Sequence, residues 1–266
     1  MQKRIISALV ALLIFIPIIF HGGSIYNFAI YLVGLICLKE FLDAKGHKKP
    51  VPFLIRIIAY IFMSSIVLVD VKSTSETFML DYRILSAMFL AFLIPVILYG
   101  KQETYDIKDA FYVLGGVLFL GISTALMIVL RNISLKIVVF IITLAVTTDS
   151  FAYITGYLIG KKQILPNLLP KKTWEGLIGG TIMGVFVAAL FYKTCINPDF
   201  SSGYLIIICT FLSLIAQLGD MAFSAMKRHF GIKDFSNLIP GHGGVLDRMD
   251  SIIFIVLGFT FFITIL

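Results

Sequence analysis

Long apolar runs separated by short polar stretches dominate the chain, and few polar residues interrupt the runs. A run of about 20 apolar residues can cross the hydrocarbon core of a bilayer as a helix. Nine such segments are readable, at about 5–20, 25–38, 52–71, 83–99, 110–130, 133–159, 177–194, 203–223 and 251–266. The pattern therefore predicts an all-α, polytopic integral membrane protein with about nine transmembrane helices.

The composition supports this prediction, because 59% of the 266 residues are hydrophobic and only 14% are charged. A soluble domain carries roughly 25% charged residues. The first run follows Lys3 and Arg4, as in a signal peptide, but the next residues, His21-Gly22-Gly23, offer no small-x-small cleavage site. We expect this run to be retained as the first helix.

The distribution of Lys and Arg predicts the orientation of the chain. An odd number of spans places the termini on opposite sides, with the N-terminus cytoplasmic and the C-terminus outside. Only five of the 22 Lys and Arg residues then lie outside, namely Lys72, Arg83, Arg131, Lys136 and Lys193. Cytoplasmic loops carry such an excess of positive charge. The net charge of +7 is thus attributed to topology and anionic lipid rather than to nucleic acid.

The whole chain is expected to form one membrane domain without a soluble module. Residues 1–130 carry scattered charge, such as Glu40, and are expected to act as a scaffold with possible oligomer contacts. Residues 131–266 hold the residues that are suited to chemistry, and we expect them to supply the catalytic helices and cytoplasmic loops.

Asp149 lies inside an apolar run that continues to Ile159, so it is expected within the membrane boundary. Tyr153 and Gly156 share its helical face, where the glycine allows another group to approach closely. A carboxylate at a solvated helix end is the alternative interpretation. An ionisable group inside the membrane is a candidate for function by default, and we favour that interpretation.

A second set of carboxylates occurs near the C-terminus. Gln217, Asp220 and Ser224 share one face of the eighth predicted helix, and Asp247 and Asp250 begin the ninth. Converging carboxylates from two helices suit a hard divalent cation such as Mg²⁺. Acidic residues are also common at helix N-termini, because the helix dipole favours them there. That alternative explains one of the two residues in the ninth helix, but it does not explain Asp220.

The loop before the ninth helix contains Gly241-His242-Gly243-Gly244. Glycines allow successive backbone N–H groups to form an anion-binding concavity, although flexible loops often have the same composition. Cations gather around the loop, and they favour a phosphate site: Lys227, Arg228, Lys233 and Arg248. His242 is expected either to donate to a phosphate or to order the loop.

Pro170-Lys171-Lys172-Thr173 precedes the seventh predicted helix. Composition alone favours a basic flank next to an interfacial Trp174. The functional alternative is a pair of lysines that reach phosphate from the same side as the aspartates. Lys161 and Lys162 are interpreted as flank.

Taken in order, the pattern from Ser224 to Asp250 resembles the signature of the phosphatidate cytidylyltransferase (CDP-diacylglycerol synthase) family. The matching residues are Ser224, Lys227, Arg228, Lys233, Asp234, Ser236, Pro240, Gly241, His242, Gly243, Gly244, Asp247, Arg248 and Asp250. The segment 170–176 resembles a second family motif, and Asp149 falls where the family has an aspartate. Leu169 departs from the family, whose members usually have serine there. The resemblance is specific over about 145–255.

The resemblance implies the reaction of CTP with phosphatidate to give CDP-diacylglycerol and pyrophosphate. It also implies a divalent cation, expected to be Mg²⁺, and it leaves open a second cation, which could be monovalent. The expected metal ligands are Asp149, Asp220, Asp247 and Asp250. The expected catalytic residues are Asp220, Asp247, Lys227, Arg228 and Arg248. The expected substrate-binding residues are Lys171, Lys172, Thr173, Ser224, Lys233, Gly241, His242, Gly243 and Gly244.

The site is expected to face the cytoplasm from the plasma membrane, where soluble CTP meets a membrane lipid. A homodimer is possible, and no nucleic-acid partner is expected. Two alternatives stay open: a CTP-dependent kinase of polyprenol type, which would release CDP, and a transporter. The absence of an inverted repeat and the placement of the candidates on one side argue against a transporter.

Overall fold

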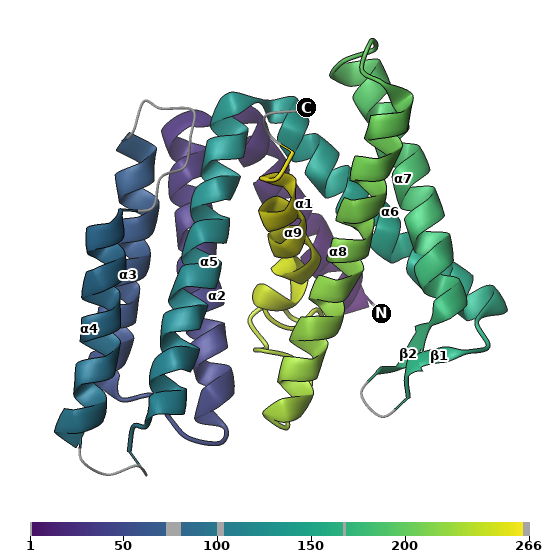
Figure 1. The fold of residues 1–266 in the computed structure, drawn as a ribbon. Helices are drawn as coiled ribbons and strands as arrows, with labels where there is room; N and C mark the ends of the chain where they lie inside the picture. Colours follow the sequence, from purple (N-terminus) through teal and green to yellow (C-terminus); the bar gives the residue numbers. More distant parts are fainter. Residues whose placement is uncertain (1, 73–80, 100–103, 167–168, 263–266) are drawn as a thin grey trace. The chain divides into compact units, whose positions relative to one another are not determined.

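A computed structural model describes residues 2–72, 81–99, 104–166 and 169–262 (Figure 1). Within these residues the chain forms nine α-helices and one short hairpin. The helices are α1 (Gln2–His21), α2 (Gly23–Gly46), α3 (Phe53–Lys72), α4 (Tyr82–Tyr99), α5 (Ile107–Ile133), α6 (Leu135–Ile159), α7 (Trp174–Cys195), α8 (Ser202–His229) and α9 (Leu246–Phe259). The predicted all-α fold class is confirmed.

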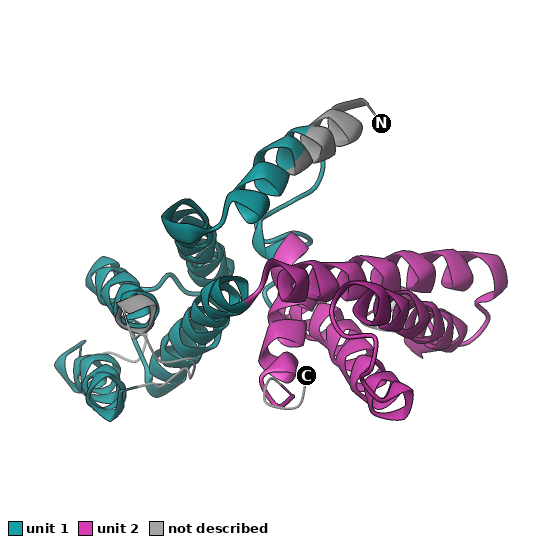
Figure 2. Ribbon diagram, turned by 90° about the horizontal axis from the view of Figure 1, so that it is seen from above, with its two compact units in different colours: residues 1–133, 230–247 teal, residues 134–229, 248–266 magenta. Residues whose placement is uncertain are grey.

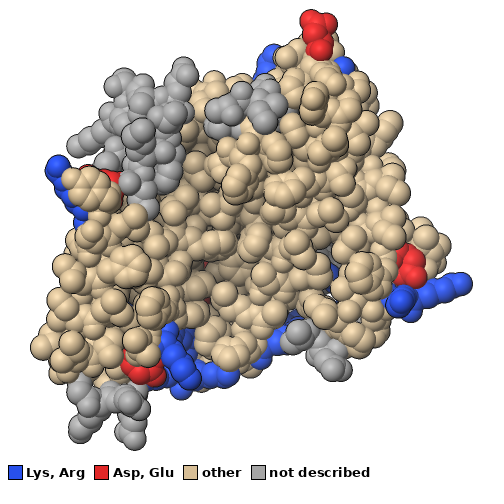
Figure 3. Space-filling view, in the orientation of Figure 1, with Lys and Arg blue, Asp and Glu red and all other residues tan. Residues whose placement is uncertain are grey.

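The membrane character is also confirmed. In the described parts of the chain, six helices are long and apolar enough to cross a bilayer: α2, α4, α5, α6, α7 and α8. The face drawn in Figure 3 is mostly uncharged. Large apolar side chains such as Ile97 and Tyr157 are about four-fifths exposed, at 81% and 80%. Such exposure is favourable when the surrounding solvent is lipid.

The chain divides into two compact units (Figure 2). Unit 1 contains residues 1–133 together with 230–247, and unit 2 contains 134–229 together with 248–266. The division near residue 133 lies close to the boundary expected at 130. Residues 230–247, which the sequence analysis assigned to the C-terminal part, group with the N-terminal helices in unit 1.

In unit 1, α5 packs against α2, α3 and α4. Gly116 of α5 lies against the ring of Phe41, which stacks on Tyr112 at 4.4 Å between ring centroids. At one end of these helices, Lys45 forms an ion pair with Asp109, and Lys49 pairs with Asp109 at 2.6 Å. This cluster ties the end of α2 to the start of α5.

Asp106 extends the same cluster, since it lies 3.0 Å from Lys49 Nζ. Burial raises the pKa of Asp106, but hydrogen bonds from the Asp109 N–H and from Lys49 outweigh this effect. The pKa of Asp106 is therefore held below its ordinary value.

In unit 2, α6 and α7 pack through glycines. Gly176, Gly180 and Gly184 recur every four residues on one face of α7. A Cβ atom at Gly180 would lie 2.7 Å from the backbone oxygen of Thr148 on α6. Small residues at this spacing let two helix backbones approach closely in a membrane. The contact fixes the turn of α6 that carries Asp149.

Helix α8 packs against both α6 and α7. Gln217 of α8 donates from Nε2 to the Thr181 hydroxyl at 2.9 Å. The hydroxyls of Thr148 and Ser213 lie 3.0 Å apart and are buried. These polar contacts within otherwise apolar helices fix the rotation of α8, and with it the direction of Asp220.

A short antiparallel hairpin connects α6 to α7, where the sequence predicted a loop that serves either as a basic flank or as a carrier of phosphate-binding lysines. Its strands are β1 (Gln163–Leu165) and β2 (Leu169–Thr173), with Gln163 opposite Thr173. The carboxylate of Glu175 accepts the N–H groups of Lys161 and Lys162 at 3.1 and 3.3 Å. Thr173 ends the hairpin and caps α7 by accepting the N–H of Gly176 at 3.2 Å.

Candidate functional site

A cavity of about 230 Å³ lies within unit 2, where α6, α8 and the hairpin meet the start of α7. Its lining residues are Asp149, Ala152, Tyr153, Ile164, Lys171, Lys172, Thr173, Gly176, Leu177, Gln217, Asp220 and Met221. The structure thus brings together five of the residues that the sequence singled out, Asp149, Lys171, Lys172, Thr173 and Asp220. They come from sequence positions up to about 70 residues apart.

An ion pair joins Lys172 to Asp220 across this cavity. Lys172 Nζ lies 2.5 Å from Asp220 Oδ2, and the two side chains are 28% and 32% exposed. Ser224, one turn further along α8, donates its hydroxyl to Asp220 Oδ1 at 3.3 Å. Both oxygens of Asp220 therefore have a partner, and the lysine predicted to reach phosphate lies next to the predicted metal ligand.

Asp250 belongs to the same electrostatic environment. Its carboxylate is buried, accepts the N–H of Ser251 at 2.8 Å, and interacts electrostatically with Asp149 and Asp220. Lys227 also acts electrostatically on Asp250, and Arg248 on Asp149. Carboxylates that interact electrostatically in this way repel one another, so a bound cation nearby would be stabilised.

The described residues do not supply a complete set of protein ligands for a metal. Among the described residues, no three His, Cys, Asp or Glu side chains lie together in a way that would hold an ion. Mg²⁺ commonly binds through one or two carboxylates and takes its other ligands from water and substrate phosphates. Asp149, Asp220 and Asp250 fit that kind of incomplete site.

Asp247 belongs to unit 1, whereas Asp149, Asp220 and Asp250 belong to unit 2. Asp247 Oδ2 accepts the N–H of Phe235 at 2.8 Å and the N–H of Gly244 at 2.9 Å. The carboxylate therefore closes the loop 235–244 on itself. This arrangement is a loop-stabilising one, and the predicted catalytic and metal-binding role of Asp247 stays a prediction.

The glycine loop is ordered by its own hydrogen bonds. Ile239 O accepts the N–H groups of His242 and Gly243 at 2.9 and 3.2 Å, and Ile239 N donates to Gly243 O at 2.9 Å. Gly241 and Gly243 have φ values of 80° and 86°, which L-residues with a side chain rarely adopt. The N–H groups of residues 242–244 thus have partners within the protein. A phosphate bound here would depend mainly on side chains such as His242 and the exposed Lys233.

Glu40 of α2 is a residue of this region that sequence reasoning missed. Its carboxylate accepts the N–H groups of Val245 and Leu246 and the hydroxyl of Ser236. The sequence offers one signal, a Lys39-Glu40 pair at the end of an apolar run. Nothing in that local pattern shows a partner about 200 residues away.

Three further cations predicted for the site, Lys227, Arg228 and Arg248, belong to unit 2. Lys227 and Arg228 form the last turn of α8 in unit 2, and Arg248 is exposed in the first turn of α9. Leu169, where the family usually has serine, is buried at the start of β2.

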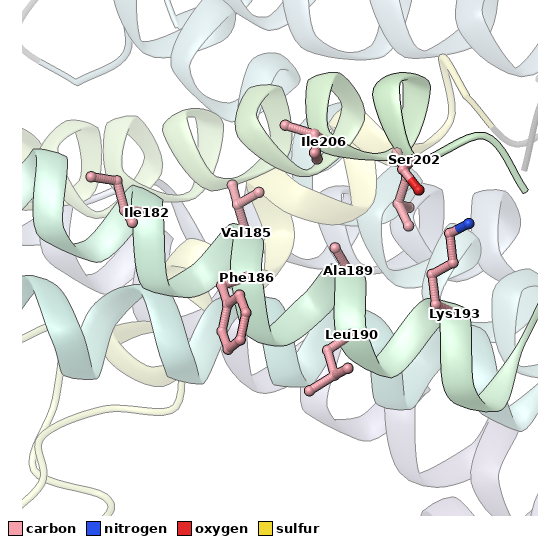
Figure 4. Close-up of a pocket in the computed structure, with 9 residues that line it drawn as sticks. Ile182, Val185, Phe186, Ala189, Leu190, Lys193, Ser202 and Ile206 are labelled. Carbon is pink, nitrogen blue, oxygen red and sulfur yellow. The ribbon is translucent and has the colours of Figure 1, made fainter. Parts of the chain in front are cut away.

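A larger groove of about 460 Å³ runs between α7 and α8 in unit 2 (Figure 4). Its lining is apolar except for Lys193 and Ser202, and it contains no carboxylate. Lys193 Nζ donates to Pro198 O at 3.1 Å. The groove therefore lacks the groups for metal or nucleotide chemistry, and the smaller cavity is the better candidate.

Comparison with known proteins gives a consistent result. The model of the cytidylyltransferase family matches residues 2–266. A phosphatidate cytidylyltransferase of Staphylococcus epidermidis is 34% identical over 257 residues, which is 96% of each chain. Proteins of the same name from Staphylococcus aureus and Staphylococcus saprophyticus are 32% and 31% identical over 258 and 256 residues, again 96% of each chain.

Proposed function

The chain belongs to the cytidylyltransferase family, and we propose that it transfers the cytidylyl group of CTP to phosphatidate. The products are CDP-diacylglycerol and pyrophosphate, and the step belongs to phospholipid biosynthesis. The observation that carries the proposal is the cavity of unit 2, where Lys171 and Lys172 meet Asp149 and Asp220. Phosphate-binding cations and metal-binding carboxylates are the two groups that this reaction needs.

The proposed chemistry requires no nucleophile from the protein. A phosphate oxygen of phosphatidate attacks the α-phosphorus of CTP and forms a new P–O bond. The bond from the α-phosphorus to the bridging oxygen breaks, and pyrophosphate leaves with that electron pair. Catalysis then depends on positioning the two anions and on stabilising the negative charge. Lys171 and Lys172 would neutralise phosphate oxygens in this step.

The carboxylates Asp149, Asp220 and Asp250 would hold Mg²⁺. When bound, the ion would supply positive charge that offsets the negative charge developing on the leaving pyrophosphate. When CTP binds, its phosphates compete with Asp220 for Lys172, so the ion pair of the free enzyme would be exchanged for contacts with substrate. Asp220 would then lose its lysine partner, and its carboxylate would be available to help hold the metal.

We also propose that the site faces the cytoplasm. The charge count supports this orientation, because 17 of the 22 Lys and Arg residues fall on the side that contains the hairpin and the loop 230–247. CTP is water-soluble and phosphatidate is held in the bilayer. A site at the membrane surface gives both substrates access.

The test is pyrophosphate release by the purified protein supplied with CTP, phosphatidate and Mg²⁺. We expect release together with CDP-diacylglycerol formation, and we expect Asp220→Asn to abolish it because the substitution removes a metal-binding charge. Lys161→Ala, in the flank of the same hairpin, is the matched control and should keep wild-type turnover. Release of CDP instead of pyrophosphate would favour a kinase, and an inactive wild-type protein would refute the proposal.

A further inference from the structure

Glu40 is a buried carboxylate in the first half of the chain, and only 3% of the residue is exposed. An ionised carboxylate is costly to bury unless hydrogen bonds compensate for the lost water. Here the donors are the Ser236 hydroxyl at 2.6 Å, Val245 N at 3.0 Å and Leu246 N at 2.7 Å. All three belong to the loop and helix start that carry the family signature.

Two of these donors stand at the beginning of α9. The first N–H groups of a helix have no partner within the helix, and a nearby side chain usually accepts them. Glu40 performs this capping from α2, about 200 residues away in sequence. A negative charge at this position is also favoured by the helix dipole, and hydrogen bonds to a charged acceptor are stronger than neutral ones.

Gly244 makes the approach of Glu40 possible. A Cβ atom at position 244 would lie 2.6 Å from Glu40 Oε2, which is closer than real contacts allow. The glycine is thus required by the packing of Glu40, independently of any contact with phosphate. The same residue donates its N–H to Asp247, so Glu40 and Asp247 hold the loop from two sides.

We propose that Glu40 is a positioning residue for the transfer reaction: it holds the segment from Ser236 to Leu246 in the shape that binds CTP. The inference rests on the proposed function, because it assumes that this loop binds the nucleotide. Glu40 does not itself touch the substrate. It acts on His242 and Asp247 through the backbone that joins them.

Kinetics of Glu40→Ala test the role in the reaction. We expect kcat/KM for CTP to fall about 100-fold, as for a misplacement of about 1 Å, while the KM for phosphatidate stays unchanged. Glu40→Gln keeps one acceptor oxygen, so its kcat/KM for CTP should lie between the values of wild type and Glu40→Ala. Asp109→Asn is the control, since Asp109 is a similarly buried carboxylate of unit 1 that pairs with Lys45 and Lys49 instead. Per folded molecule, its KM for CTP should be that of wild type.

Hydrogen exchange of the full-length protein, measured without substrate, tests whether Glu40 orders the loop. Glu40→Ala and Gly244→Ala should both accelerate exchange of the Val245 and Leu246 amides, and Asp109→Asn should not. Because Gly244→Ala acts by displacing Glu40, its effect should largely disappear when Glu40 is already alanine.

The outcomes separate the two proposals. Wild-type exchange and wild-type KM for CTP in Glu40→Ala and Glu40→Gln would overturn the positioning role, even if the wild-type protein is fully active. A wild-type protein that does not use CTP would refute the proposed function, and the exchange data would still decide whether Glu40 orders the loop. If Glu40→Ala and Asp109→Asn changed the KM for CTP and the amide exchange equally, Glu40 would contribute only to general stability. That result would refute the inference.

Discussion

At the scale of single residues, the two aspartates expected to act together have different surroundings. Asp220 pairs with Lys172 and lines the cavity of unit 2. Asp247 instead accepts two backbone N–H groups on a single oxygen, Oδ2. The structural role of Asp247 and its predicted catalytic role are compatible, but they respond differently to substitution.

Asp247→Asn and Asp247→Ala separate these two roles. The amide oxygen of asparagine can accept both N–H groups, so Asp247→Asn should keep the loop ordered while it removes the negative charge. We expect it to be folded, with hydrogen exchange in the loop like that of wild type, and to be inactive in pyrophosphate release. Asp247→Ala leaves two buried N–H groups without an acceptor, at a cost of about 1–3 kcal/mol each, and should also lose loop protection. Full activity of Asp247→Asn would show that the charge has no role in catalysis.

At the scale of secondary structure elements, the α6–α7 pair determines the geometry of the cavity. Gly176, Gly180 and Gly184 place the backbone of α7 directly against α6, next to the turn that carries Asp149. The hairpin that bears Lys171 and Lys172 is attached to the ends of these same two helices. A change in the distance between α6 and α7 would therefore move both Asp149 and the two lysines of the hairpin.

Gly180→Ala tests this packing. Its Cβ would meet Thr148 O and Ala152 Cβ, both at 2.7 Å, so the helices must separate or shift. Overpacking of this kind costs about 1–3 kcal/mol, and we expect a lower thermal midpoint and reduced turnover. Gly115→Ala is the matched control, because nothing lies within 4 Å of a Cβ there. Alanine is favoured over glycine in a helix by about 1 kcal/mol, so this variant should be neutral or stabilised. Equal behaviour of the two variants would refute the close packing.

At the scale of the whole molecule, the chain is a multi-pass membrane protein whose charged residues determine its orientation. The charge count predicts that the C-terminal end of α7 faces the outside and that the hairpin before α7 faces the cytoplasm. Lys72 and Lys101, which enter this count, have side chains outside the described residues. The native cysteines provide a direct test, because Cys195 is exposed at the end of α7, whereas Cys37 and Cys209 are buried.

A membrane-impermeant maleimide should label Cys195 in intact protoplasts or spheroplasts, because this position is predicted to lie outside. In the Cys195→Ser background, Lys161→Cys should be labelled only after the membrane is opened. Lys161 is a suitable site since it is exposed and lies at the start of the hairpin connection. The reverse labelling pattern would show that the chain has the opposite orientation. The proposed site would then lie on the side of the membrane that lacks CTP.

The sequence by itself determined the fold class, the approximate helix limits and the family. Apolar runs form helices in a bilayer because no water is available there for backbone groups, so hydropathy alone predicts them. The sequence also singled out Asp149 and Asp220, because charged residues are conspicuous in apolar sequence. Composition favoured a basic flank for Lys171 and Lys172, and the family resemblance made them candidates. Only the tertiary structure decided which of these meet, and it placed Asp149, Asp220 and the two lysines around one cavity.

The tertiary structure also decided what holds the glycine loop. The sequence placed the loop with the C-terminal half, whereas in the structure it packs with the N-terminal helices through Glu40. Local patterns report a residue's neighbours along a helix or strand, and they contain no information on a partner about 200 residues away. The hydrogen bonds of Glu40 and the close approach at Gly244 exist only because α2 and the loop are packed together.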